Sequence, residues 1–245
     1  MPSAAPGRPR RIAPERLQRL LAAAQVLERD PHGVKVARLP SGTILKLFRR
    51  KRLLSSAAWR PYALRFVRNA QALNVLAVPT VSVRAYWHCP QAQRHVVAYR
   101  PLKGDVLRDR LGDGKAVDWP ALARFAARLH DRGVYFRSLH SGNIVCVPTG
   151  GFGLIDIADL QVLRGPLGTR RRIRNLRPLL RDPALSALRK PELFGDLIDA
   201  YCRSANAHPR QEARLRRLAW RQWARCTDQG SGASASGSPS LTGNR

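Results

Sequence analysis

The sequence contains no long hydrophobic run. None of its apolar stretches reaches the roughly 20 residues that a helix needs to cross a bilayer. The first eleven residues are rich in Pro, Arg and small side chains, and they lack the apolar core of a secretory signal. We therefore expect a cytoplasmic protein, or one that is bound at a membrane surface.

Cysteines are few and widely separated. The four cysteines form no CxxC pair; they are Cys89, Cys146, Cys202 and Cys226. Cysteine zinc sites and the disulfide frameworks of small secreted domains both show closer spacing. We expect reduced, mostly buried thiols and no cysteine metal site.

Acidic residues are scarce as well. Sixteen Asp and Glu stand against 44 Lys and Arg, which gives a formal net charge of +28, nearly all of it from arginine. Such a chain attracts polyanions: nucleic acid, an anionic membrane leaflet or a phosphorylated glycolipid. A genome rich in G and C favours arginine codons and would explain part of the arginine excess, but the positive electric field of the protein would remain. Nucleic acid is the least supported partner, because no helix-turn-helix, zinc finger or aromatic stacking motif accompanies the charge.

The pattern of elements predicts an α+β fold. Two β-like runs, Val34 to Leu39 and Thr43 to Phe48, flank a Pro-Ser-Gly turn and indicate a hairpin. Helical spacing occurs at about 14–27, 61–76, after Asp118, after Pro191 and at 209–226, and strand-like runs occur at 78–87, 96–99, 144–147 and 153–157. Residues 101–104 read as a hinge. We expect a disordered basic N-terminus (1–13), a sheet-rich N-lobe (14–103), a mainly helical C-lobe (104–228) and a disordered Gly/Ser tail (229–245).

The most informative stretch runs from Leu129 to Asp159, LHDRGVYFRSLHSGNIVCVPTGGFGLIDIAD. It resembles the catalytic and metal-binding loops of kinases, in which an Asn and, on the next strand pair, an Asp bind the metal. Asn143 and Asp156 stand thirteen residues apart, a spacing that matches. A short hairpin between them would return the carboxylate beside the amide. Two oxygen ligands would then converge on one Mg²⁺, whose shell water and phosphate oxygens complete.

Other segments extend this resemblance. SLHSGNI resembles the D-L-H-x-G-N-I of sugar and small-molecule kinases, and LKL at Lys46 resembles the strand whose lysine grips the nucleotide phosphates. RFVRNAQALNVLAVPTV resembles the helix and strand that follow, and VVAYRPLKG, with Tyr99, resembles the strand and hinge that hold adenine. Together these segments resemble the Kdo/heptose lipopolysaccharide kinase family, including members labelled toluene tolerance proteins, over about residues 25–205.

The resemblance implies a two-lobed protein-kinase-like fold, with an antiparallel-sheet N-lobe, that uses ATP and Mg²⁺. It implies that Asn143 and Asp156 hold the metal. It also implies that Lys46, Tyr99 and Gly33 contact the nucleotide, although Gly33 is only the best remnant of a glycine-rich phosphate loop.

Two departures from the family fall at the site. Ser138 occupies the position of the base aspartate, and a neutral hydroxyl cannot accept the substrate proton as a carboxylate does. Two residues later, His140 is either a substitute base or γ-phosphate contact, or a histidine that only orients the loop. The glutamate that normally pairs with the lysine is missing, because no Asp or Glu occurs between Lys46 and Asp105. Asn69 is a neutral candidate for its place.

Plainer interpretations of single residues stay open. Lys46 taken alone would be a solvated charge, and Asn143 a loop-capping amide. Asp159 is either a second metal or substrate carboxylate, or a cap or salt-bridge partner. The seven arginines from Arg164 to Arg181 are either a solvated face or a site for an anionic acceptor.

Three functions compete. The first is an ATP-dependent kinase acting on a lipopolysaccharide core sugar, Kdo or heptose, from the inner face of the inner membrane, where each basic residue near an anionic leaflet contributes about 1 kcal/mol. The second is a pseudokinase that binds nucleotide and serves as a regulatory or binding module in lipopolysaccharide biogenesis. Ser138 and the missing glutamate support this second interpretation. The third, a nucleic-acid binder, rests on charge alone. Turnover of ATP separates the first from the second.

Overall fold

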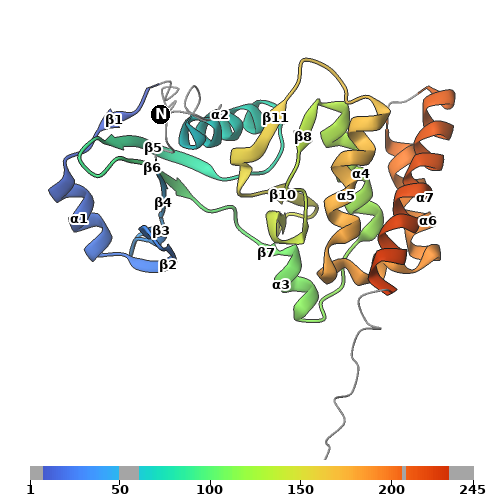
Figure 1. The fold of residues 1–245 in the computed structure, drawn as a ribbon, viewed down its shortest axis with the longest axis horizontal. Coiled ribbons are helices and arrows are strands. Elements are labelled where there is room, and N and C mark those ends of the chain that lie inside the picture. Colours follow the sequence, from blue (N-terminus) through green and yellow to red (C-terminus); the bar gives the residue numbers. More distant parts are fainter. Residues whose placement is uncertain (1–7, 50–60, 206–207, 232–245) are drawn as a thin grey trace, which may run out of the picture.

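The computed structural model describes residues 8–49, 61–205 and 208–231 (Figure 1). Its N-terminal part is a six-stranded sheet in the order β1-β5-β6-β4-β3-β2. The strands are β1 (Arg10–Arg11), β2 (Gln25–Asp30), β3 (Gly33–Arg38), β4 (Ile44–Arg49), β5 (Ser82–Cys89) and β6 (Arg94–Arg100). Neighbours are antiparallel except β1, which runs parallel to β5. The predicted hairpin is confirmed as β3 and β4.

Two helices cover opposite faces of this sheet, as Figure 1 shows. Leu45 of β4 packs in the cluster beneath α1 (Pro14–Ala22), whereas Phe48 of the same strand contacts α2 (Tyr62–Val75). Successive side chains of a strand point to opposite faces, so residues 46 and 48 share a face. Lys46 is therefore directed toward α2.

Two small sheets follow the connection at residues 101–104. One has the order β10-β9-β7 and the other pairs β11 with β8. Their elements are β7 (Asp105–Val106), β8 (Val134–Phe136), η2 (Ser141–Asn143), β9 (Ile144–Cys146), β10 (Phe152–Leu154), η3 (Ile157–Asp159) and β11 (Leu160–Val162). The loops that carry the predicted catalytic residues lie between these strands.

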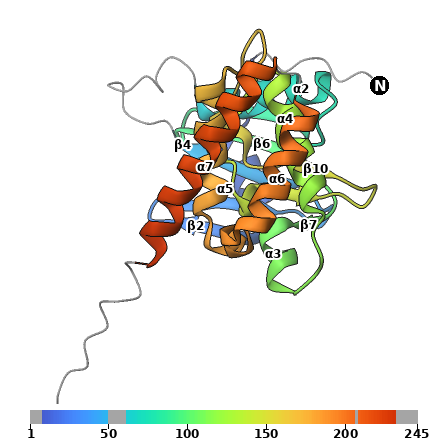
Figure 2. The same cartoon turned by 90° about the vertical axis from the view of Figure 1, so that its right-hand side faces the viewer.

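Helices make up most of the remaining C-lobe (Figure 2). They are α3 (Leu107–Gly112), α4 (Trp119–Asp131), α5 (Thr169–Arg181), the 3₁₀ segment η4 (Pro183–Arg189), α6 (Pro191–Ser204) and α7 (Pro209–Ser231). Helix α4 packs against α6, and α5 packs against α7. Asp118 caps α4, because its Oδ1 accepts a hydrogen bond of 2.7 Å from the backbone N–H of Ala121.

The fold class is α+β as predicted, with an antiparallel-sheet N-lobe and a mainly helical C-lobe, but several boundaries differ. Strand β5 lies at Ser82–Cys89 rather than at 78–87, and β10 at Phe152–Leu154 rather than at 153–157. Arg10 and Arg11, expected to be disordered, form β1. The first helix ends at Ala22 rather than near Leu27, because the backbone from Gln25 onward pairs with β3. Helix α7 continues to Ser231, beyond its expected end near residue 226. The segments 1–7 and 232–245 of the expected disordered ends lie outside the described residues.

The structure also bears on the predicted thiols and on the length of the apolar segments. All four cysteines are free, and all but Cys146 are buried. Within the described ranges, no helix combines the length and the apolar character needed to cross a bilayer.

Candidate functional site

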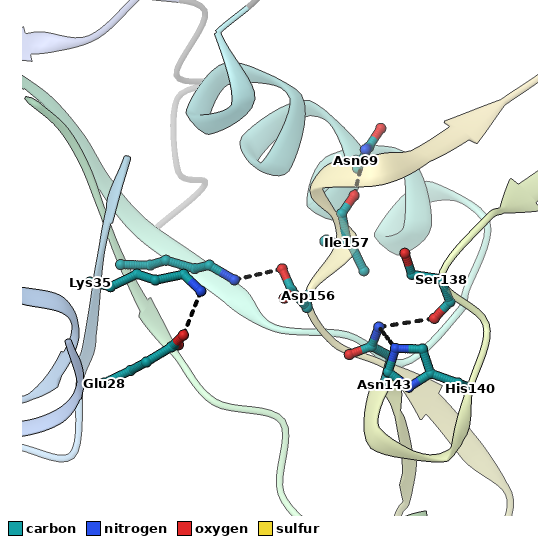
Figure 3. A network of polar contacts seen from close by, with 9 residues as sticks. Glu28, Lys35, Asn69, Ser138, His140, Asn143, Asp156 and Ile157 are labelled. Atoms are coloured by element: carbon teal, nitrogen blue, oxygen red, sulfur yellow. Dashed lines mark hydrogen bonds and ion pairs between the residues drawn. The ribbon is translucent and has the colours of Figure 1, made fainter. Parts of the chain in front are cut away.

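Lys46 and Asp156, each predicted to bind part of a magnesium nucleotide, meet between the two lobes. The Lys46 Nζ lies 2.5 Å from the Asp156 Oδ1, although the residues are 110 positions apart (Figure 3). The rings of Phe48 and Phe66 lie 5.8 and 5.7 Å from the same ammonium group. The lysine side chain is only 11% exposed, so these rings and the carboxylate replace most of its water.

Asp156 stands in a left-handed backbone conformation. Its φ and ψ are 49° and 46°, a region that Asp and Asn enter more readily than other non-glycine residues. The chain before it is fixed on both sides, because Leu154 N–H donates to the Pro79 carbonyl and Ile155 N–H donates to the Asn143 carbonyl, at 2.9 and 3.0 Å. The turn leaves the carboxylate 54% exposed toward the space between the lobes.

Asn143 is held by the loop that precedes it. Its Nδ2 donates to the Ser138 carbonyl at 2.9 Å and lies 3.1 Å from the His140 Nε2. Because the amide nitrogen is used in this way, the carbonyl oxygen of the side chain has no hydrogen-bond partner among the described residues. Figure 3 shows the Asn143 and Asp156 side chains facing the same space. An acceptor oxygen and a carboxylate thus converge as the spacing predicted.

The contact with Asn143 constrains the role of His140. An amide N–H at the Nε2 makes that nitrogen the acceptor, so the proton of a neutral ring sits on Nδ1. The Nδ1 is buried and has no hydrogen-bond partner in the described part of the chain. Of the two interpretations left open for His140, this geometry favours the loop-orienting one.

Ser138, which the resemblance puts at the position of the base aspartate, contributes backbone to the loop. Its carbonyl accepts from Asn143 and from the backbone N–H of His140. The hydroxyl has no hydrogen-bond partner among the described residues, and Figure 3 shows it on the side that faces Ile157.

Buried polar residues, which the sequence did not identify, hold the catalytic loop. The Asp182 Oδ2 accepts from the Ser141 N–H and hydroxyl at 2.7 and 2.6 Å. The Asn175 side chain brackets Phe136, accepting from its N–H and donating to its carbonyl at 2.7 and 2.8 Å. Both come from about 40 residues downstream, where no local motif marks them.

Helix α2 supplies no acidic partner, and Asn69 does not replace the missing glutamate. Its Nδ2 instead donates to the carbonyls of Ile157 and Leu160 at 2.6 and 2.8 Å, which ties α2 to the segment after Asp156. Asp159 lies 3.7 Å from the Arg65 Nη2 on α2, in line with the salt-bridge interpretation. Lys46 therefore pairs with the carboxylate of Asp156 and not with an acidic residue of α2.

The other two predicted nucleotide contacts lie farther out. Gly33 forms the tip of the β2–β3 hairpin and has a φ of 113°. It lies three residues before Val36 of β3, which pairs with Lys46 of β4. The ring of Tyr99 lies 5.2 Å from that of Phe66, behind the site. Burial raises the pKa of Tyr99, and the nearby charge of Asp156 raises it further. Tyr99 thus packs against the same Phe66 ring that lies by the Lys46 ammonium group, whereas Gly33 lies at the hairpin tip.

A second lysine, missed in the sequence, faces the same space. Lys35 of β3 pairs with Glu28 of β2 at 2.5 Å (Figure 3). The hydrogen bond that Lys35 donates to this carboxylate raises the pKa of Lys35, and the charge of Asp156 adds to the shift. The hairpin register pairs Lys46 with Val36, so strand alternation alone did not indicate that Lys35 would lie near this space.

These residues fit a magnesium nucleotide. Asp156 and Asn143 offer one charged and one neutral oxygen, and two such protein ligands suit Mg²⁺, which keeps water and phosphate oxygens in its shell. Within the described residues no group of three or more His, Cys, Asp or Glu could hold a metal by itself. The donor set therefore matches a metal brought with phosphates rather than a closed protein cage.

Comparison with known proteins gave structural similarity only. No family model matches the chain, and no curated protein matches it. Similar solved structures include one of monomeric WbdD, with 17% identity, a TM-score of 0.43, and coverage of 73% of this chain and 42% of that one. A second is a structure of WbdD described as a bifunctional kinase-methyltransferase, with 15% identity, a TM-score of 0.41, and coverage of 75% of this chain and 45% of that one. A third is a high-resolution WbdD structure, with 14% identity, a TM-score of 0.44, and coverage of 81% of this chain and 49% of that one. This chain spans less than half the length of each.

Proposed function

We propose that this chain is an ATP-dependent kinase-like protein that phosphorylates a sugar of the lipopolysaccharide core, Kdo or heptose. The observation that carries the kinase part is the convergence of Lys46, Asp156 and Asn143 on one space between a sheet and a helical lobe. The sugar acceptor is supported by the sequence resemblance and by the positive charge of the chain.

Each residue has a task in this proposal. Bound Mg²⁺ would neutralise charge on the phosphates during transfer. Asp156 and Asn143 would hold the metal, and Lys46 would leave Asp156 for the phosphates. His140 would keep the Asn143 amide turned so that its oxygen faces the metal. The substrate hydroxyl would lose its proton to water, because Ser138 cannot take it and the His140 Nε2 already accepts from Asn143.

A nucleotide-binding module without catalysis is the second candidate. Ser138 supports it directly, since no carboxylate stands at the base position. The Lys46–Asp156 contact also supports it, because the two charges already satisfy each other when no ligand is present. Phosphoryl transfer nevertheless depends mostly on positioning and charge neutralisation, and a base adds only a factor of about 10²–10⁴. We therefore favour a slow kinase.

Attachment to an anionic membrane surface, the inner face of the inner membrane, is part of the proposal. Five exposed arginines recur at spacings of four, three, four and four residues along α7; they are Arg210, Arg214, Arg217, Arg221 and Arg225. This spacing places them on one face of the helix, over about 22 Å. The neighbouring Glu212 and Asp199 both pair with Arg216. Among the described residues, the five have no salt-bridge partner.

Transfer of phosphate from labelled ATP to dephosphorylated core oligosaccharide tests the kinase against the binding module. We expect slow transfer by the wild-type protein, equal or faster transfer by Ser138→Asp, and a sharp loss in His140→Ala. Nucleotide binding is measured in parallel on each variant. Absence of transfer from both wild type and Ser138→Asp, with nucleotide binding intact, would establish the binding module instead.

A further inference from the structure

A second concave site lies beside the catalytic loop. It is a pocket of about 240 Å³ lined by Tyr135, Gln161, Leu163, Arg170, Arg171 and Arg174. Tyr135 of β8 and Gln161 of β11 stand directly opposite each other in the strand pair, so their side chains share a face. The three arginines come from the first turns of α5, whose N-terminal backbone adds a partial positive charge.

The pocket arginines contrast with Arg172 in the same helix. Arg172 is buried and fully engaged: it donates to Asp131, to the Tyr201 hydroxyl and to the Leu167 carbonyl. Arg170, Arg171 and Arg174 are exposed and have no ion pair or hydrogen bond among the described residues. Arg172 is thus structural, whereas Arg170, Arg171 and Arg174 converge on a hollow without a counter-charge.

The position of the pocket connects it to the chemistry. Ser138 follows Tyr135 by three positions, so their Cα atoms lie at most about 11 Å apart. On the partner strand, Gln161 follows Asp156 by five residues, and Leu160 pairs with Phe136 at the end nearer the catalytic loop. A molecule with its hydroxyl at the site would have its far side within reach of the arginines.

We propose that this pocket binds a phosphate group that the acceptor already carries. Guanidinium groups bind phosphate oxygens through paired N–H donors, and the Tyr135 hydroxyl and Gln161 amide add neutral donors. The role as an acceptor subsite rests on the proposed kinase function; phosphate binding by the pocket does not. The acceptor would be a sugar phosphorylated at a position other than the one that receives the new phosphate.

Calorimetric titration of the full chain with glucose 6-phosphate, and with glucose as the uncharged reference, tests the proposal at fixed ionic strength. The pocket variant is Arg171→Gln/Arg174→Gln. Arg214→Gln/Arg217→Gln on α7 removes the same charge elsewhere. Lys46→Gln excludes binding at the nucleotide site. We expect binding of glucose 6-phosphate but not of glucose, at least about tenfold weaker in the pocket variant and within about twofold of wild type in the other two.

Equal weakening in both arginine variants would overturn the proposal, since it would mean general attraction by the net charge. Loss of binding only in Lys46→Gln would also overturn it. A phosphate of a lipid headgroup is the other source of the same chemistry. If the pocket variant lost binding to vesicles containing phosphatidylglycerol but kept its affinity for glucose 6-phosphate, an acceptor phosphate would be excluded. The titration needs no turnover, so failure of the kinase function does not decide it.

Discussion

Lys46 and Asp156 form an ion pair that a magnesium nucleotide would have to break. The Asp156 carboxylate is half exposed, and water screens its attraction to the lysine, so opening the pair costs little. Each charge then finds a stronger partner, the carboxylate in the metal and the ammonium in the phosphates. The contact is thus compatible with binding and explains how the site is stable without an acidic residue on α2.

Single residues were predictable where the chemistry is local in the sequence. Asn143 and Asp156 are joined by one short hairpin, so their spacing alone indicated that they converge. Asp182 and Asn175 lie about 40 residues from the loop atoms that they bind. Only the packing of α5 and η4 brings them there, and no periodicity in the sequence reports such a contact.

His130 gives a prediction for the pH dependence of stability. Burial lowers its pKa from 6.5 to about 3, and the charge of Arg172 adds to this. The unfolded chain therefore binds a proton at this histidine below pH 6.5, whereas the folded chain binds it only below about pH 3. The free energy of unfolding consequently falls as the pH falls from 6.5 to about 3. Between pH 7 and pH 5 this one group should cost about 2 kcal/mol.

Urea denaturation at the two pH values, on wild type and His130→Gln, measures this contribution. The variant should lose about 2 kcal/mol less than wild type over the interval. The exposed His32, replaced in His32→Gln, serves as the control and should behave as wild type. An unchanged pH dependence in His130→Gln would show that the buried histidine does not cause the acid sensitivity.

Among the elements, those with clear periodicity were predicted, whereas the first helix was predicted with the correct start but the wrong end. The alternation in residues 34–48 has one solution, because a shift by one residue would turn Lys46 into the apolar cluster beneath α1 and Leu45 toward α2. The run from Pro14 to Leu27 fits a helix by its leucines, yet its last part pairs with β3 and leaves Leu27 45% exposed. Strand pairing is a long-range gain that helical spacing cannot reveal.

The connection between the lobes should be sensitive to one methyl group. Gly104 has a φ of 130°, and a Cβ there would lie 2.1 Å from the Cys146 carbonyl oxygen. Gly104→Ala must therefore move the chain against β9, and overpacking of this kind costs about 1–3 kcal/mol. Gly150→Ala is the matched control, because Gly150 also has a positive φ of 89° but open space around it. Urea midpoints at constant slope give the difference, and equal losses would contradict the close contact.

At the scale of the whole molecule, the charge should direct the protein to anionic surfaces. Co-sedimentation with phosphatidylglycerol vesicles should weaken about thirtyfold in Arg214→Gln/Arg217→Gln, at about 1 kcal/mol per basic residue, and it should fall steeply with salt. The α5 double variant, Arg171→Gln/Arg174→Gln, removes as much charge and should bind vesicles more strongly than the α7 variant. Binding that is independent of anionic lipid would refute membrane attachment.

The α+β class could be predicted from the sequence because it depends on the order of segments, which composition and spacing report. How the lobes place their loops against each other depends on contacts such as those of Asn69 with the segment after Asp156. These join backbone atoms about 90 positions away to a single side chain. They became visible only in the folded chain.

A thermal-shift titration with Mg²⁺ and ATP tests the central claim, that Lys46, Asn143 and Asp156 form a nucleotide site. At a hundred times the dissociation constant, the ligand should stabilise the wild-type fold by about 2.7 kcal/mol, or roughly 5–10 °C. Asp156→Ala should lose most of this shift, and Asp159→Ala, which removes a carboxylate outside the proposed metal site, should keep it. If no adenine nucleotide gives a magnesium-dependent shift in the wild-type protein, the three residues do not form such a site.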